Sequence, residues 1–371
     1  MNAEQKIKEL LSRAGVTVNG QNPYDPQVHD ERLYSRVLSG GTLALGEAYM
    51  DGWWDVDDMS ELFHRVLLAD IQTAVMETGV LFSVLQEKLF NRQNKARAFQ
   101  VGEKHYDLGN DLYQKMLDRR MTYTCGYWKD AKTLDEAQEA KLDLVCRKIG
   151  LKKGDRVLDI GCGWGSFAQY AAEKYGASVV GVTVSKEQVA LGSERVKGLP
   201  VEIRLQDYRA ISDGPYDHIV SLGMFEHVGH KNYRTYMKKV HELLKDGGLF
   251  LLHTIGSNQL TPISDPWIDR YIFPNGMLPS VQQLGASIEK LFVMEDWHNF
   301  GADYDKTLMN WYLNFEKAWS SLKEKYGERF CRMWRYYLLF TAGAFRSRQN
   351  NQLWQIVLSK NGVPGGYQSI R

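Results

Sequence analysis

The chain has 371 residues, enough for one large domain and a smaller one, and its 44% hydrophobic and 25% charged residues are typical of a globular protein. A net charge of +1 gives no overall attraction to nucleic acid or anionic lipid, so membrane contact would have to come from local patches. No apolar run approaches the roughly 18 residues that a spanning helix needs, and the first residues lack the apolar centre of a signal peptide. The four cysteines show no C-x-x-C pairing, which predicts a reduced, cytoplasmic protein without a metal site or disulfides.

Residues 1–87 are predicted to form a small, mostly helical domain, because apolar residues recur there at helical spacing between Asn-Pro and Gly-Gly turns. The aromatic-rich segment Gly46–Trp54 is interpreted as core and a turn, or alternatively as a docking surface. Residues 88–104 form a basic linker, with five lysines or arginines against the single acid Glu103. Interleaved apolar residues make this linker a candidate lipid-facing segment, and a solvated basic helix is an equally good interpretation.

Strand and helix alternate from Leu151 onward, which predicts an α/β fold with a doubly wound, Rossmann-like parallel sheet. The catalytic domain is assigned to residues 105–371, and the aromatic-rich sequence beyond Ile255 is predicted to form a cap over its cleft. Helices are expected at Ser166–Tyr175 and Tyr233–Leu244. The predicted strands are Arg156–Ile160, Ser178–Val182, Val201–Leu205, His218–Leu222 and Leu249–His253.

One segment of this pattern, Val157–Gly165, is a short apolar run that breaks into alternating glycines. It predicts a buried strand that turns sharply into a helix, where a ligand can approach the backbone and meet free N–H groups. The spacing differs from the dinucleotide pattern G-x-G-x-x-G, because Ser166 stands where the third glycine would be. G-x-G-x-G after Asp159 favours S-adenosylmethionine over another nucleotide or a structural turn.

Chemistry-bearing side chains follow the predicted strands, at the edge of the sheet where ligands bind. Glu226 is either an exposed acid at a helix start or a functional group, and His253 either packs in the core or faces the cofactor. Together, an acid and an imidazole on neighbouring strand ends could hold a base or serve as one. Cys125 has no histidine or positive cluster near it in the sequence to activate its thiol, which favours packing over a nucleophile.

Many dispersed blocks, in the right order, resemble the cyclopropane fatty acid synthase family over essentially the whole chain. The N-terminal helical domain is similar to the extra domain of the bacterial phospholipid enzymes of that family, which the mycolic acid cyclopropane synthases lack. The blocks are the glycine motif together with His105–Leu112, Tyr123–Trp128, Gly181–Ser185, Gly223–Gly229, Leu252–Gly256, Tyr271–Gly276 and Glu295–Tyr304.

The resemblance implies that a cis double bond of a membrane phospholipid acyl chain attacks the methyl group of S-adenosylmethionine. The carbocation then loses a proton from the added methyl to bound bicarbonate and closes to a cyclopropane. By the same resemblance, Glu226, His253 and Tyr304 hold the bicarbonate with side chains, and Cys125 and Ile255 contribute mainly backbone groups. The implied cofactor contacts are Tyr123, Thr124, Asp159, Gly161, Gly163, Gly165, Thr183, Ser185, Gln188, Asp207 and Tyr208.

The resemblance also implies a homodimer that contacts the inner face of the cytoplasmic membrane peripherally. Some relatives carry a cysteine beside an Ala-Gly-Ala-Phe segment; here Thr341 stands in its place, which argues against a covalent mechanism. One alternative is the same methyl transfer ending in a branched or hydroxylated chain. Two others are a small-molecule N- or O-methyltransferase and an inactive lipid-binding module.

Overall fold

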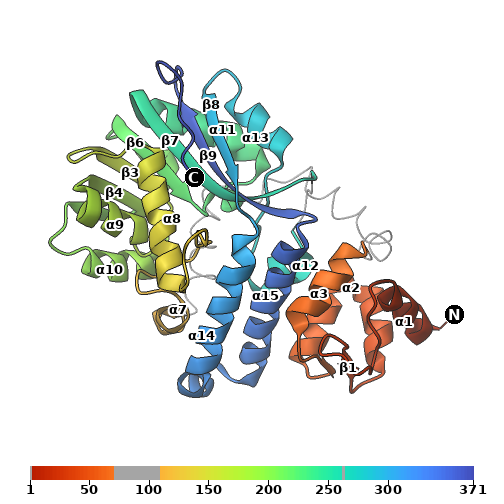
Figure 1. Cartoon of the computed structure of the whole chain (residues 1–371). Helices are drawn as coiled ribbons and strands as arrows, with labels where there is room; N and C mark the ends of the chain where they lie inside the picture. The colour runs from red at the N-terminus through yellow and green to blue at the C-terminus, as the bar shows by residue number, and fades with distance from the viewer. Residues whose placement is uncertain (1, 71–108, 261–263) are drawn as a thin grey trace. The chain divides into compact units, whose positions relative to one another are not determined.

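The computed structural model describes residues 2–70, 109–260 and 264–371, and these form two compact units (Figure 1). Residues 2–70, 264–274 and 304–351 make the first unit, and residues 109–260, 275–303 and 352–371 make the second. The predicted linker 88–104 lies outside the described residues, as does the start of the block His105–Leu112. The first unit therefore combines the N-terminal helices with segments from far along the chain, and the division at residues 87 and 105 stays a prediction.

The first unit is helical and has only a two-stranded sheet among its described residues. Asn2 and Gln5 start its first helix with a reciprocal capping box, and Asp58 caps the third. The third helix packs closely on the last one through Gly343, where a Cβ atom would lie 2.4 Å from the backbone oxygen of Ser60. The elements are α1 (Ala3–Arg13), β1 (Gln27–Val28), α2 (Arg32–Met50), β2 (Trp54–Asp55), α3 (Met59–Leu68), α12 (Pro266–Tyr271), α14 (Asp303–Tyr326) and α15 (Glu328–Ser347).

The aromatic-rich segment Gly46–Trp54 lies at the end of α2 and in β2. Tyr49 and Trp54 are buried and their ring centroids are 5.2 Å apart. A Cβ atom at Gly46 would lie 2.4 Å from the Trp267 ring, so glycine lets α12 pack directly on α2. The segment is core and turn, as the packing interpretation predicts.

The second unit contains a seven-stranded sheet with the order β5-β4-β3-β6-β7-β9-β8. The five strands from β5 to β7 pair in parallel, and β8 pairs with β9 in antiparallel. This topology confirms the α/β fold and the five predicted strands. The strands are β3 (Arg156–Ile160), β4 (Ser178–Thr183), β5 (Val201–Leu205), β6 (Tyr216–Leu222), β7 (Leu244–Ser257), β8 (Val293–Asn299) and β9 (Asn351–Ser359).

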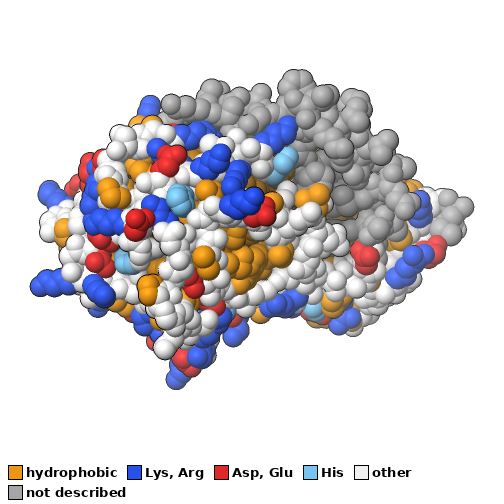
Figure 2. All heavy atoms as spheres, turned by 90° about the horizontal axis from the view of Figure 1, so that it is seen from above, with side chains coloured by type: hydrophobic (Ala, Val, Ile, Leu, Met, Phe, Trp, Pro, Cys, Tyr) orange, Lys and Arg blue, Asp and Glu red, His pale blue; other side chains and the backbone are white. Residues whose placement is uncertain are grey.

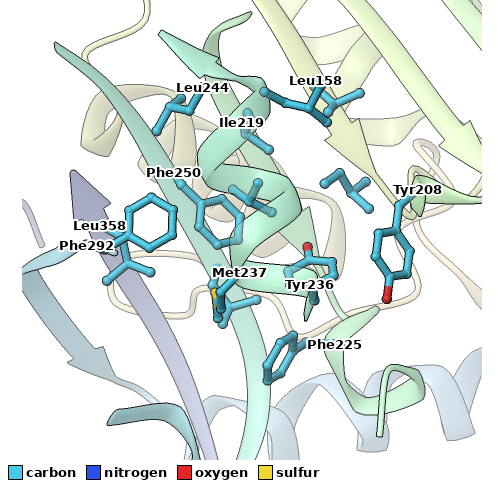
Figure 3. Packing of buried hydrophobic residues seen from close by; sticks show 14 of the residues in the cluster. Leu158, Tyr208, Ile219, Phe225, Tyr236, Met237, Leu244, Phe250, Phe292 and Leu358 are labelled. Atoms are coloured by element: carbon cyan, nitrogen blue, oxygen red, sulfur yellow. The ribbon is translucent and has the colours of Figure 1, made fainter. Parts of the chain in front are cut away.

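Helices cover both faces of this sheet, as a doubly wound fold requires. On one face, Tyr236 and Met237 of α11 lie against Ile219 and Phe250 of the central strands (Figure 3). On the other, apolar residues of α8 and α9 pack on β3 and β4. The helices are α7 (Asn110–Met116), α8 (Leu134–Lys148), α9 (Ser166–Tyr175), α10 (Lys186–Arg195), α11 (Tyr233–Leu243) and α13 (Val281–Ile288).

Two strands of the sheet, β8 and β9, come from the region beyond Ile255 that was predicted to form a cap. β8 carries the polar residues Glu295, Asp296 and His298, which hide the alternation expected of a strand. β9 is almost entirely buried, and only its neighbours in the sheet show why. The cap prediction therefore missed two strands that complete the sheet beside β7.

Candidate active site

The glycine motif forms a sharp turn between β3 and α9. Gly161, Gly163 and Gly165 have φ angles of +83°, +56° and +79°, which residues other than glycine rarely adopt. At Gly161 there is a second constraint, because a Cβ atom would lie 2.5 Å from the Cβ of Met224. The turn is thus held by backbone geometry, and it leaves the start of α9 open to a ligand.

A pocket opens beside this turn, and all of its lining residues belong to the second unit. Six of the eleven predicted cofactor contacts line it: Tyr123, Thr124, Asp159, Gly161, Gly163 and Gln188. The remaining lining residues are Met121, Thr122, Lys141, Cys162, Trp164, Ser166, Phe167, Leu222 and Gly223.

The end of β4 supplies hydroxyl and amide groups in place of an acidic residue. Thr183 Oγ1 donates to Gln188 Oε1 at 2.6 Å, and the backbone N–H of Gln188 donates to Ser185 Oγ at 3.3 Å. Ser185 thereby caps α10 and turns Gln188 into the pocket wall. Gln188 therefore offers an uncharged polar contact to a bound nucleoside.

The two predicted contacts at the end of β5 do not line the pocket. The Asp207 carboxylate accepts from the Arg209 backbone N–H at 2.9 Å and pairs with the Arg209 guanidinium at 3.1 Å. The ring of Tyr208 is buried against Tyr236, with centroids 5.0 Å apart. In this structure both residues stabilise the short helix after β5, and their contact with a cofactor stays a prediction.

The pocket wall from Asp118 to Thr124, here called the pocket strap, is held by polar residues that the sequence analysis did not identify. Asp118 Oδ1 accepts from the Thr122 N–H at 2.7 Å and shapes a turn in which Met121 has a φ angle of +57°. From α8, Gln138 Nε2 donates to the Thr124 backbone oxygen at 2.7 Å and Lys141 Nζ donates to Thr124 Oγ1 at 2.8 Å. The signal in the sequence is a set of polar residues, Gln138, Lys141 and Lys148, at helical spacing on a largely apolar helix face.

Asp159 brings a buried carboxylate to the pocket. Its Oδ1 has no hydrogen-bond partner among the described residues, and burial raises the pKa of Asp159 to about 7 while Lys141 opposes the shift. A buried acceptor without a donor is costly, so this atom is suited to a ligand that donates, such as an ammonium group.

His253 lies in β7 opposite Leu222, the last residue of the adjacent strand β6, and Glu226 lies in the short 3-10 helix Phe225–His227 that follows β6. The backbone N–H of Ile255 donates to Glu226 Oε1 at 2.6 Å, and the Gly223 N–H donates to the His253 backbone oxygen at 2.8 Å. Both side chains are buried, which excludes the interpretation of Glu226 as an exposed acid. We call Glu226, His253 and Ile255 the cradle.

Two side chains of the cradle each keep one polar atom without a partner among the described residues: Glu226 Oε2 and His253 Nε2. Burial raises the pKa of Glu226 to about 7, and burial holds the pKa of His253 well below its ordinary value. Gln355 Nε2 on β9 lies 3.4 Å from His253 Nδ1. With Nδ1 accepting, the imidazole hydrogen is on Nε2, so the cradle presents a neutral N–H donor beside a carboxyl oxygen.

Two other residues predicted for this site, Cys125 and Tyr304, come from the second and the first unit. Cys125 is fully buried and its Sγ donates to the Gly126 backbone oxygen at 3.2 Å, which fits packing better than nucleophilic attack. Tyr304 belongs to the first unit, where its ring stacks on Phe345 with centroids 4.3 Å apart. Its place in the cradle stays a prediction.

Thr341, which stands where some relatives carry a cysteine, bonds within its own helix. Its Oγ1 donates to the backbone oxygen of Tyr337 at 2.6 Å. In the described ranges, no group of three or more His, Cys, Asp or Glu side chains is arranged to hold a metal ion. Of the helices that the structure describes, none has both the length and the apolar character to cross a membrane.

Comparison with known proteins agrees with this geometry. The model of the mycolic acid cyclopropane synthetase family matches residues 93–356. The chain is 54% identical over 364 residues to the cyclopropane-fatty-acyl-phospholipid synthase of Escherichia coli (strain K12), covering 98% of this chain and 94% of that protein.

Two solved structures share the fold of this chain. The cyclopropane synthase MmaA2 from Mycobacterium tuberculosis is similar with a TM-score of 0.66 and 31% identity, over 71% of this chain and 98% of that one. The mycolic acid cyclopropane synthase CmaA1, complexed with SAH and CTAB, is similar with a TM-score of 0.64 and 32% identity, over 70% of this chain and 98% of that one. The chain therefore belongs to the mycolic acid cyclopropane synthetase family and is an S-adenosylmethionine-dependent methyltransferase.

Proposed function

We propose that this enzyme transfers a methylene group from S-adenosylmethionine to the cis double bond of an unsaturated phospholipid acyl chain and forms a cyclopropane. The likeness to the Escherichia coli synthase over 98% of the chain supports this substrate class. The single observation that carries the proposal is the cradle. Ring closure requires a buried site that accepts a proton, whereas simple methyl transfer to a polar atom does not need such a site.

The reaction begins with an alkene, which is a weak nucleophile. Its π electrons form a bond to the methyl carbon as the sulfur–carbon bond breaks, which leaves S-adenosylhomocysteine and a carbocation on the acyl chain. Loss of a proton from the added methyl then frees the electron pair that closes the ring. The protein must therefore align the two substrates, exclude water from the cation and remove one proton.

The pocket residues serve the first requirement. The glycine turn brings backbone close to the nucleoside, and Gln188 offers a polar contact from the end of β4. The Asp159 carboxylate is suited to the amino group of the methionine end. The pocket strap closes the other side, and α8 holds it through the hydrogen bonds to Thr124.

The cradle serves the last requirement. Bicarbonate carries both a hydroxyl donor and oxygen acceptors, and the two unpartnered atoms of the cradle, Glu226 Oε2 and His253 Nε2, match them. When bound there, bicarbonate would supply the base for the transferred methyl. Glu226 and His253 would orient it, and the Ile255 N–H fixes the Glu226 carboxyl in place.

Three further statements belong to the same proposal: the enzyme is a homodimer, it is cytoplasmic, and it contacts the inner face of the membrane peripherally. The homodimer is implied by the family resemblance, the cytoplasmic location is the prediction from the cysteine pattern, and the membrane contact follows from a substrate that resides in a bilayer. Tyr304 is proposed as a third bicarbonate-binding side chain, with Cys125 contributing backbone.

The test incubates the purified protein with S-adenosylmethionine, bicarbonate and vesicles of a cis-monounsaturated phospholipid, and measures the mass and ring protons of the recovered acyl chains. A gain of one CH₂ with cyclopropane protons is expected, lost in Glu226→Gln and in bicarbonate-free buffer. Glu202→Gln, at an exposed carboxylate on β5, is the matched control and should retain the product. A branched or hydroxylated chain would contradict ring closure, and an unchanged lipid would contradict the substrate class.

A further inference from the structure

A buried cation and a buried anion line the cosubstrate pocket without binding each other. Lys141 on α8 and Asp159 at the end of β3 are both pocket residues, and neither side chain exposes more than 1% of its surface. Lys141 Nζ donates to Thr124 Oγ1 at 2.8 Å, whereas Asp159 Oδ1 has no hydrogen-bond partner in the described part of the chain. The pocket lining thus contains an ammonium group and a carboxyl group that do not pair with each other, and a ligand that carries both charges matches them.

Within the described ranges of the chain, Lys141 Nζ makes one hydrogen bond, to Thr124 Oγ1. An ammonium group has three N–H donors, and the neutral Thr124 hydroxyl takes one of them. Burial lowers the pKa of Lys141 to about 8, with Asp118, Cys125 and Asp159 opposing that shift. A buried charge in this position is stabilised when an anionic group enters the pocket beside it.

A purely structural role for Lys141 is poorly supported by the contacts around it. The pocket strap is already tied to α8 by Gln138 Nε2, which lies 2.7 Å from the Thr124 backbone oxygen. The strap's turn is fixed from within by Asp118. A neutral side chain would suffice to pack beneath the strap, so the charge of Lys141 needs another explanation.

We propose that Lys141 Nζ binds the carboxylate of S-adenosylmethionine and thereby selects a methyl donor with an intact amino-acid end. The methionine end carries an ammonium and a carboxylate on the same carbon, and the pocket offers Asp159 to the first and Lys141 to the second. This inference rests on the assignment of the pocket to S-adenosylmethionine in the proposed function. It makes Lys141 a specificity-determining residue for the cosubstrate.

Isothermal titration calorimetry with two ligands tests the proposal. S-adenosylmethionine and its decarboxylated form share the sulfonium, the adenosine and the amine, and differ only in the carboxylate. The wild-type protein should bind S-adenosylmethionine more tightly by on the order of 10- to 100-fold, the range expected for a charge-assisted hydrogen bond. Lys141→Met should lose most of that preference and bind the decarboxylated ligand within about threefold of wild type.

Lys148→Met is the matched control, because Lys148 is equally buried on the same helix but does not line the pocket. It pairs with Asp296 at 3.6 Å, so its loss should lower the melting temperature and leave the ratio of the two affinities unchanged. Lys141→Arg retains the charge and should retain part of the preference.

The outcomes separate this inference from the proposed function. Equal losses for both ligands in Lys141→Met would overturn the carboxylate contact and make Lys141 a structural tie. Should Lys141→Met fail to fold, equal affinity of the wild-type protein for the two ligands would overturn the proposal by itself. If the wild-type protein binds neither ligand, the assignment of the pocket fails first.

Discussion

The cosubstrate pocket and the cradle lie near the carboxyl ends of neighbouring strands, but one is shaped mainly by a backbone turn and the other by buried side chains. The turn of the pocket depends on backbone, because it contains three glycines with positive φ angles. The cradle depends on two buried side chains, each with one polar atom left without a partner in the described residues. A site built from backbone is changed by added volume, whereas a site built from buried polar side chains is changed by the loss of one atom.

The largest expected effect is on the cradle, in Glu226→Gln. The amide keeps the shape of the carboxyl but cannot be ionised, so cyclopropane formation should fall by about 10²- to 10⁴-fold. The affinity for S-adenosylmethionine should change by less than about threefold, because Glu226 does not line the pocket. Product analysis together with calorimetry checks both values. An equal loss of cosubstrate affinity would contradict the separation of the two sites.

A side chain added at the glycine turn should instead lower the affinity for S-adenosylmethionine. Gly161→Ala adds a Cβ 2.5 Å from Met224 at a φ angle of +83°, so it should weaken S-adenosylmethionine binding by roughly 10- to 100-fold and lower stability by about 1–3 kcal/mol. Gly150→Ala isolates the cost of a positive φ, since its φ angle is +63° and no atom lies within 4 Å of the added carbon. This control should lower stability by about 1 kcal/mol in denaturant unfolding and leave binding unchanged. Normal binding in Gly161→Ala would contradict the account of the turn.

The buried carboxyl of Glu226 should also make stability depend on pH. Its pKa is about 7 in the folded protein against an ordinary value of 4.5, so the folded state holds a proton that the unfolded state has lost between these values. The stability from this group is complete below pH 4.5 and is lost as pH rises through 7. Between pH 4.5 and 8, wild type should lose about 3 kcal/mol relative to Glu226→Gln in urea unfolding. If the difference in unfolding free energy between wild type and Glu226→Gln stayed constant from pH 4.5 to 8, the Glu226 carboxyl would not be desolvated in the folded protein.

The smallest effect is expected at Gln355, which contacts the cradle from β9. Gln355→Leu removes the contact to His253 Nδ1, so the imidazole can exchange between its two neutral forms and catalysis should fall by about tenfold. Nitrogen NMR of labelled histidine should show a hydrogen on Nε2 in wild type and a mixture in the variant. A hydrogen on Nδ1 in the wild-type protein would contradict the assignment of His253 as a donor.

The glycine turn of the pocket could be predicted from the sequence, whereas the residues that support the pocket strap and the cradle could not. The glycine turn and the five parallel strands are encoded in local segments, because each strand and its turn are contiguous in the chain. Lys141, Gln138 and Asp118 were missed, since each acts through a contact that only the folded chain brings about. Gln355 was missed for the same reason, because it lies 102 residues after His253 on β9, whose place in the sheet only the folded chain shows.

The resemblance to the family supplied roles that geometry alone does not reveal. It predicted Glu226, His253 and Ile255 for one site; the structure shows the Ile255 N–H bonded to Glu226 and places His253 two residues before Ile255 on β7, and their joint role stays a prediction. For Asp207 and Tyr208 the structure shows contacts within their own loop and with α11, and their contact with a cofactor stays a prediction.

Ring closure requires the transferred methyl group to lose one proton. The number of deuterium atoms that the product retains from S-adenosylmethionine with a trideuterated methyl group measures this loss most directly. The wild-type enzyme is incubated with this cosubstrate, bicarbonate and vesicles of cis-monounsaturated phospholipid, and the acyl chains are examined by mass spectrometry. The product is expected to carry a CD₂ group in a cyclopropane, with one deuterium lost to the base. A product that keeps the whole CD₃ group, as a branched or hydroxylated chain would, contradicts this expectation.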